Sequence, residues 1–246
     1  MPLPSLSSRA ALRGFTLTEL AIVLVIVALM IGGMLVSLST TRDLAGEKET
    51  QKQLTVINDA LIGFMAAQQR LPCPAAPAAT GVESPAGGAC THPFTGFVPA
   101  ITLGITPANA QGYAIDAWGN PIRYAVTTTL TTTAHAFTTA GGLKAAWASD
   151  PTAIKPDLFV CSTAAHVTAN DCPAAERLTD TAVAIVFSTG RNGGEAPTSA
   201  DELANGTASN DKVFVSAAPG PAFDDLLVWL SPNTLYGRLI AAGRLP

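Results

Sequence analysis

The chain has 246 residues, of which 48% are hydrophobic and 13% charged, so it has enough apolar material for a core and too little charge for a disordered tail. Its net charge at pH 7 is -4, and leaving out Arg9 and Arg13 gives 12 basic against 18 acidic residues. This balance argues against nucleic acid as a partner. We expect one sizeable domain with an N-terminal appendage.

The N-terminus places a short basic segment before a long apolar run. No charged residue occurs from Leu20 to Thr41, a length close to the roughly 20 residues that an α-helix needs to cross a membrane. Residues 1–14 are polar and basic, so the positive-inside rule predicts a cytoplasmic leader and a non-cytoplasmic chain after the run. An ordinary secretory signal loses its apolar part at cleavage, whereas a cut after Gly14 keeps it.

The sequence GFTLTEL, from Gly14 to Leu20, followed by the apolar run, resembles the class III signal of type IV pilins and type II secretion pseudopilins. The resemblance implies cleavage after Gly14 by a prepilin peptidase and methylation of the new amino terminus at Phe15. It also implies partners: other pilins or pseudopilins in a helical filament, an inner-membrane assembly platform and membrane lipid. The implied location is the inner membrane, single-pass with the head in the periplasm, and later a pilus or pseudopilus.

Glu19 is the one acidic residue at the start of the apolar run. A carboxylate on a membrane helix costs roughly 2 to 3 kcal/mol unless it is paired, so such residues usually have a function. Cleavage would create an amine at Phe15, and in a bundle of identical helices this amine can neutralise Glu19 of a neighbour. We therefore expect Glu19 to direct subunit assembly. The alternative is a simple membrane-anchored periplasmic protein whose Glu19 lies among lipid headgroups.

Beyond the uncharged run that ends at Thr41, the sequence has an apolar stripe that predicts a continuation of the helix. Its residues recur at three- and four-residue spacing: Leu54, Ile57, Leu61 and either Phe64 or Met65. We expect one helix over residues 15–70, transmembrane over about 15–38 and stopped before Pro72. The predicted fold class is α+β: a pilin-like fold in which a long N-terminal helical spine, transmembrane in its first half, packs on a globular head, residues 71–246, with an antiparallel β-sheet.

Several segments of the head have strand-like patterns between turn signals. They are residues 112–116, 121–128, 134–140, 157–162, 182–190, 212–217 and 226–231. The chain then predicts a short helix with Ser231 as N-cap, Pro232 at its first position and Gly243 past its end.

The stretch DAWGNPIRYAV, Asp116 to Val126, is similar to a segment typical of major type II secretion pseudopilins and related subunits. Gly119 and Asn120 favour a turn, which makes Trp118 a packing residue rather than a ligand-binding one. The segments FSTGRNGG and the tail from Phe223 resemble parts of large minor pilin-like proteins of Gram-negative bacteria.

Four cysteines allow three pairings. A head in an oxidising compartment favours disulfides, and pairing of neighbours in the sequence predicts Cys73 with Cys90 and Cys161 with Cys172. A zinc site is the disfavoured rival, because there is no Cys-x-x-Cys pair and the three histidines lack ligand spacing.

An acidic loop, residues 193–212, contains Glu195, Asp201, Glu202 and Asp211. The related major pseudopilins hold calcium in a C-terminal loop, so these carboxylates are weak calcium candidates. A solvated acidic loop is the preferred interpretation, and no cofactor or metal is expected.

No sequence motif of a hydrolase, a nucleotide-binding loop or a dinucleotide site occurs, so no enzymatic activity is expected. These features together predict a minor pilin or pseudopilin, a structural subunit of a type IV pilus or a type II secretion filament. The rival function is a tip-located adhesin or ligand-binding subunit that shares the same helix.

Overall fold

A computed structural model of the chain describes residues 15–78, 80–128, 134–168, 170–206, 211–220 and 222–245, without the side chains of residues 32–41. The predicted leader, with the cleavage position at Gly14, lies outside the described residues. The chain divides into two compact units, which we call the first unit (Met1–Leu44) and the second unit (Ala45–Pro246).

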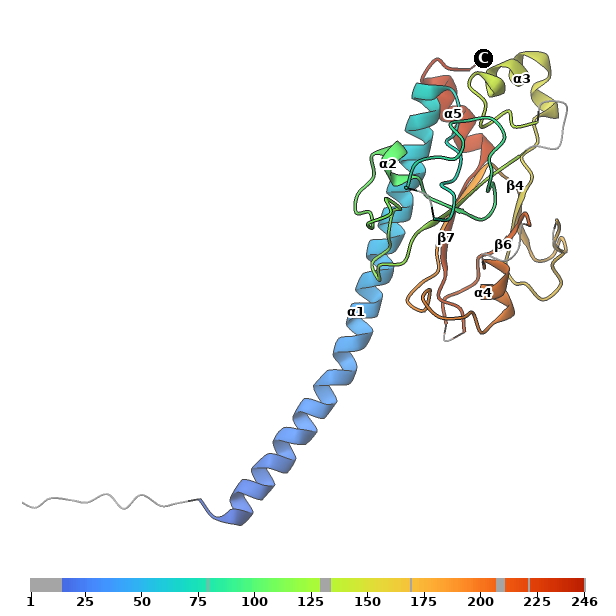
Figure 1. Ribbon diagram of the computed structural model, residues 1–246. Helices are drawn as coiled ribbons and strands as arrows, with labels where there is room; N and C mark the ends of the chain where they lie inside the picture. The colour runs from blue at the N-terminus through green and yellow to red at the C-terminus, as the bar shows by residue number, and fades with distance from the viewer. Residues whose placement is uncertain are drawn as a thin grey trace, which may run out of the picture. The chain divides into compact units, whose positions relative to one another are not determined.

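Helix α1 (Leu17–Gln68) contributes to both units (Figure 1). It corresponds to the helix predicted over residues 15–70. The helix ends where Gln69 adopts a left-handed backbone conformation with a φ of 57°. Residues 45–68 of α1 belong to the second unit, together with the chain that follows the helix.

The prediction that the first half of α1 is transmembrane is wrong. In the part of the chain that the structure describes, no helix is both long enough and apolar enough to span a membrane. Charged residues begin at Arg42 and Asp43. The single-pass inner-membrane anchor that depended on this segment is therefore not supported.

The second unit contains two β-sheets. The larger sheet has four antiparallel strands in the order β1-β2-β5-β7: β1 (Gly96–Phe97), β2 (Arg123–Val126), β5 (Ala184–Ser188) and β7 (Leu226–Leu230). The smaller sheet has the order β4-β3-β6: β4 (Arg177–Ala182), β3 (Leu158–Cys161) and β6 (Val213–Val215).

The expected antiparallel sheet is present, but the smaller sheet was not foreseen and is mixed. Strand β3 pairs antiparallel with β4 and parallel with β6. Parallel neighbours need a long connection, and here the chain passes through β4, β5 and α4 (Ala200–Ala204) before it returns as β6.

The central strand β5 is covered on both faces of the four-stranded sheet, which explains why it is apolar at nearly every position. On one face, Tyr124 and Val186 join the core formed by α1 and the C-terminal helix α5 (Pro232–Ala241), which lie side by side in Figure 1. On the other face, Ile185 and Phe187 pack against residues of the smaller sheet. The predicted stripe of α1 points into the first core: Leu54, Ile57, Leu61 and, of the two alternatives, Met65.

Shorter helices lie in the connections: α2 (Ala100–Leu103), α3 (Gly142–Ser149) and the 3-10 turn η1 (Pro151–Ala153). The predicted start of α5 is confirmed, because the Ser231 side chain accepts a hydrogen bond from the Thr234 amide and Pro232 opens the helix. Gly243 follows its end with a φ of 66°.

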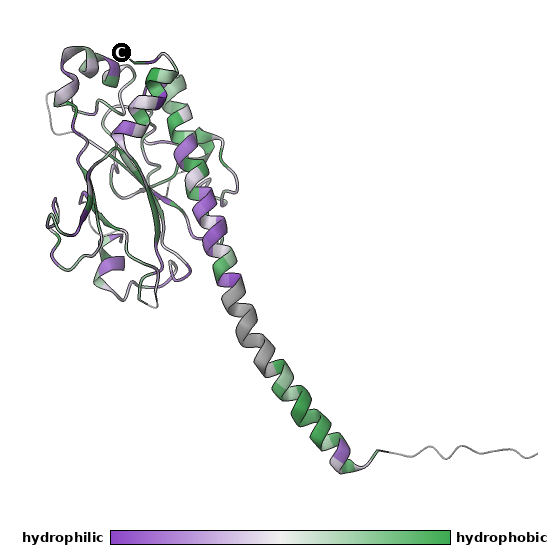
Figure 2. Ribbon diagram, turned by 180° about the vertical axis from the view of Figure 1, so that it is seen from behind, coloured by the Kyte–Doolittle hydropathy of each residue, from purple (hydrophilic) through white to green (hydrophobic). Residues whose placement is uncertain are grey.

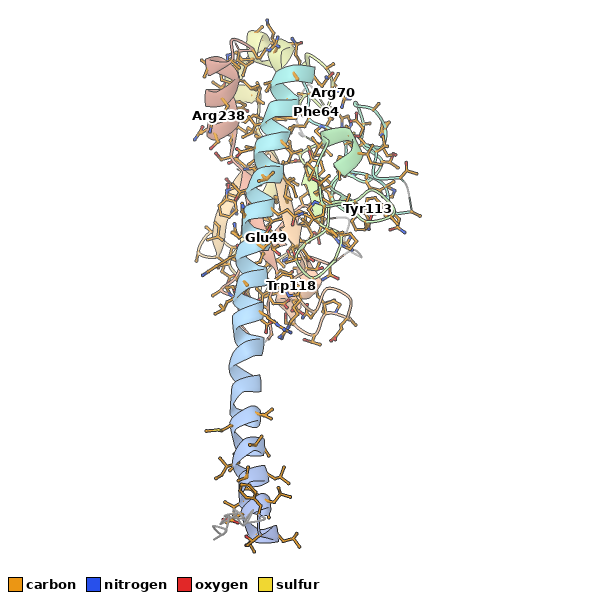
Figure 3. The ribbon with its side chains drawn as sticks, turned by 90° about the vertical axis from the view of Figure 1, so that its left-hand side faces the viewer. Glu49, Phe64, Arg70, Tyr113, Trp118 and Arg238 are labelled. Carbon is orange, nitrogen blue, oxygen red and sulfur yellow. A yellow bond between two sulfur atoms is a disulfide. The ribbon has the colours of Figure 1, made fainter. Side chains whose placement is uncertain are left out.

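Trp118 lies beside α1 in Figure 3, which is the packing position expected from the turn around it. A Cβ atom placed on Gly46 of α1 would lie 3.0 Å from Cζ2 of the Trp118 ring. The Gly46→Leu substitution should therefore displace the ring and lower the free energy of unfolding by about 1 to 3 kcal/mol, measured by urea unfolding of the full-length chain.

Gly63 on the same helix provides the matched control, since it is exposed and a Cβ there would meet nothing within 4 Å. Gly63→Leu should raise the free energy of unfolding by about 0.5 to 1 kcal/mol through helix propensity alone. Equal stability of the two variants would show that the Trp118 contact does not constrain the helix.

Candidate functional site

The first residues of α1 form a capping box around Glu19. The backbone amide of Thr16 donates to Oε2 of Glu19 at 3.0 Å, and the Glu19 amide donates to the Thr16 hydroxyl at 3.3 Å. The Thr16 hydroxyl also donates to Oε2 at 2.9 Å. These hydrogen bonds hold the pKa of Glu19 below its ordinary value. The carboxylate therefore stabilises the helix start and is ionised at neutral pH.

The apolar residues that follow Glu19 are exposed on every side of the helix. Figure 2 shows this first part of α1 as predominantly hydrophobic. Consecutive side chains are between 42% and 72% exposed, from Leu20 and Ile22 through Val27 to Leu29 and Ile31. A helix turns once in 3.6 residues, so a continuous apolar run covers its whole circumference. A helix that is apolar all round is normally buried against other apolar surface.

Both disulfides have the predicted pairing, Cys73 with Cys90 and Cys161 with Cys172. The first bond closes the proline-rich connection after α1, and the second joins the end of β3 to the segment before β4. All four cysteines lie in the second unit and none is free. Each bridge restricts the unfolded chain and stabilises the fold by about 3 kcal/mol in the chain-entropy model.

The four carboxylates considered for calcium have different partners. Asp201 accepts hydrogen bonds from the Thr163 hydroxyl and the Ala164 amide, whereas Glu202 accepts them from Asn192 and from the Thr198 amide. Glu195 is exposed, and Asp211 accepts from the Val213 amide. Over the described residues, no group of three or more histidine, cysteine or acidic side chains is arranged to hold a metal ion.

A cavity of about 330 Å³ lies where β2, the loop after β5, helix α4 and the start of β7 meet. It is lined by Arg123, Thr189, Asn192, Gly193, Glu195, Pro197, Glu202, Leu203, Gly206 and Asp225. Glu202 and Asp225 are each only 5% exposed. We call this cavity the α4 pocket.

Charged groups of opposite sign face the α4 pocket without forming an ion pair among the described residues. Burial lowers the pKa of Arg123 to about 10, and Asp225 partly offsets this effect. The pKa of Asp225 is raised to about 7, chiefly by burial and also by the charges of Glu202 and Asp224, although Asn205 and Arg123 act to lower it. The sequence analysis singled out Glu195 and Glu202 but missed the pocket, because Arg123 comes from a distant part of the chain.

The predicted site residues thus fall into separate places. Phe15 and Glu19 lie at the start of α1, Gly14 lies outside the described residues, and the cysteines serve the second unit. Comparison with protein-family models, curated proteins and solved structures gave no match. Any function must therefore be argued from the residues of this chain.

Proposed function

We propose that the chain is a minor pilin or pseudopilin, a structural subunit of a type IV pilus or a type II secretion filament. It is cleaved after Gly14 by a prepilin peptidase, methylated at Phe15 and assembled through the N-terminal part of α1. The observation that carries this proposal is the sequence GFTLTEL at the start of a helix whose described apolar side chains, from Leu20 to Ile31, are exposed all round.

The exposed apolar helix supports assembly because its described apolar side chains from Leu20 to Ile31 are not buried. At about 25 cal/mol per Å² of apolar surface, packing such a helix against copies of related helices is strongly favourable. A filament of parallel helices would cover the whole circumference, whereas a contact with one flat surface would cover only one side. The distribution of apolar residues therefore favours a bundle.

Glu19 supports the proposal because a capping box does not require a charged side chain at this position. A glutamine at this position of a capping box accepts the same hydrogen bond from the N-cap amide. A carboxylate adds a negative charge that can pair with the amine of a processed Phe15 in a neighbouring subunit. This pairing would set the register between adjacent helices.

The two disulfides agree with a head that matures in an oxidising compartment, as a filament outside the cytoplasm requires. The second unit is large for a subunit that must stack along a filament shaft. We therefore place the subunit among the minor components of the filament.

The test separates the charge of Glu19 from its capping role. Glu19→Gln keeps the capping hydrogen bond and removes the charge, so we expect its share in the sheared filament fraction to fall at least about tenfold. Thr16→Ala removes the cap and keeps the charge, so we expect near-normal incorporation. Quantitative mass spectrometry of the filament fraction from native cells measures both variants, and intact mass gives the N-terminus.

A mature N-terminus at methylated Phe15, with incorporation lost only in Glu19→Gln, is the expected result. Normal incorporation of Glu19→Gln together with loss of incorporation in Thr16→Ala would show that Glu19 acts only as a helix cap. Retention of the residues before Phe15 in the mature protein would overturn the proposal.

A further inference from the structure

The α4 pocket is lined by Arg123, one of whose guanidinium nitrogens is buried without a hydrogen-bond partner. Within the described residues, Nη1 of Arg123 is buried and has no acceptor. The guanidinium lies over the Phe97 ring, with its carbon 4.8 Å from the ring centroid. A buried donor that lacks an acceptor is costly, and arginine is suited to bind a carboxylate through two parallel hydrogen bonds.

Two carboxylates of the lining, Glu202 and Asp225, which we call the acidic wall, are held by hydrogen bonds. Nδ2 of Asn205 donates to Asp225 at 2.8 Å and to the Val215 carbonyl at 2.9 Å, while Oδ1 accepts from the Val215 amide. Asn205 is 1% exposed, so Asp225 is fixed from behind by a fully engaged amide. Glu202 is likewise held, by Asn192 and by the Thr198 amide.

The lining therefore offers one cation and three carboxylates, those of Glu195, Glu202 and Asp225. An anion alone would satisfy Arg123 but would be repelled by the acidic wall. A metal ion would be repelled by Arg123, and Glu202 already accepts two hydrogen bonds. A molecule with a carboxylate at one end and ammonium groups elsewhere can bind Arg123 through the carboxylate and the acidic wall through the ammonium groups.

We propose that the α4 pocket binds a small zwitterion with net positive charge, of the class of free basic α-amino acids, with its carboxylate on Arg123 and its ammonium group on Asp225. The volume of about 330 Å³ falls within the range of small-molecule sites. Leu203 and Pro197 supply apolar contact for the methylene groups of such a side chain. The proposal stands independently of filament assembly.

Isothermal titration of the purified full-length chain with L-arginine and L-lysine tests the proposal. We expect saturable binding of these probes, and weaker binding or none with acetate, n-butylamine or L-glutamate. Arg123→Gln should weaken L-arginine binding at least about tenfold, because it removes a charge-assisted hydrogen bond. Arg123→Lys keeps the charge, so its affinity for L-arginine should lie between those of the wild type and Arg123→Gln.

Arg177→Gln is the matched control, because Arg177 also lies over a phenylalanine ring, that of Phe159 at 5.3 Å, and does not line the pocket. It should leave L-arginine binding unchanged. Asp225→Asn provides a second, independent variant and should weaken binding through the ammonium end. No saturable binding of either amino acid at millimolar concentration, equal binding of acetate or n-butylamine, or binding of calcium ions alone would each overturn the proposal.

Discussion

Replacing Glu83 with alanine is expected to lower the free energy of unfolding by about 3 to 5 kcal/mol, because it leaves a buried arginine without its partner. Arg70 and Glu83 form a two-pronged ion pair, with Nη1–Oε2 and Nη2–Oε1 distances of 2.6 and 2.7 Å. Their side chains are only 13% and 7% exposed. Glu83 also accepts a hydrogen bond from the Cys73 amide, so the pair joins the end of α1 to the first disulfide. Urea unfolding of the full-length chain measures the loss.

The pair between Arg177 and Asp171 is the matched control, since it has the same 2.6 Å distance but a side chain of Asp171 that is 60% exposed. Asp171→Ala should cost at most about 1 kcal/mol. The double variant Arg70→Met, Glu83→Gln removes both charges and keeps an acceptor for the Cys73 amide. It should recover much of the loss caused by Glu83→Ala. A cost for Glu83→Ala no larger than that for Asp171→Ala would show that burial does not govern these pairs.

The Arg70–Glu83 pair also shows why part of the core was beyond sequence analysis. Arg70 was expected only as the end of a helix, and Glu83 lies in a connection rich in proline and glycine that has no periodicity. The two come together because the chain turns back after α1 and the Cys73–Cys90 bridge fixes that return. A contact between two irregular segments leaves no pattern in either of them.

Strands that are buried on both faces were the easiest to predict. The apolar run over 182–190 contains β5, which is buried at every position, because a strand covered on both sides must be apolar throughout. The run over 226–231 contains β7, an edge strand whose first four side chains are partly exposed. Strand β4 was missed, since it lies at the edge of the smaller sheet with most of its side chains at least partly exposed. Its sequence, RLTDTA, has too few apolar residues to signal a strand.

The strand predicted over 134–140 is wrong for a local reason. His135 has a left-handed backbone conformation, with a φ of 61°, and its carbonyl accepts hydrogen bonds from the Thr138 and Thr139 amides. The Thr138 hydroxyl donates to the Gly88 carbonyl at 2.6 Å. Threonine favours strands on average, but its hydroxyl also stabilises turns, and here the turn prevails.

The N-terminal prediction failed in a different way. The absence of charge from Leu20 to Thr41 predicts a membrane span, but no helix among the described residues is both long enough and apolar enough to be one. The same residues predicted a helix correctly, because helix formation depends on the helix propensity of the residues and not on a minimum apolar length. A membrane span additionally needs a sufficient apolar length.

The second large effect concerns Asp225, whose replacement by asparagine should stabilise the protein above about pH 7. The pKa of Asp225 is raised to about 7 in the folded chain, chiefly by burial, from about 3.9 when unfolded. The folded state therefore holds a proton that the unfolded state releases, and wild-type stability falls as the pH rises from about 4 to 7. The loss amounts to at most roughly 4 kcal/mol, since each pKa unit corresponds to about 1.4 kcal/mol.

Asp225→Asn keeps an oxygen that can accept from Asn205 and has no proton to lose. Its stability relative to wild type should be near zero at pH 4, increase through pH 5 to 7, and level off above about pH 7.5. Urea unfolding of both full-length proteins across this range measures the difference. A difference independent of pH would place the titration of Asp225 at its ordinary pKa and remove the burial argument for the acidic wall.

Asp157 is a matched control with the opposite sign. It directly precedes β3 as Asp225 precedes β7, and it is 6% exposed against 5%. Burial raises the pKa of Asp157, but hydrogen bonds from Lys212 and Thr127 outweigh this and hold it below its ordinary value. Asp157→Asn should therefore destabilise the protein at neutral pH, and the loss should fade as the pH falls below about 4. Two equally buried aspartates that respond to pH in opposite directions would show that the partner of each carboxylate, and not burial alone, decides its charge.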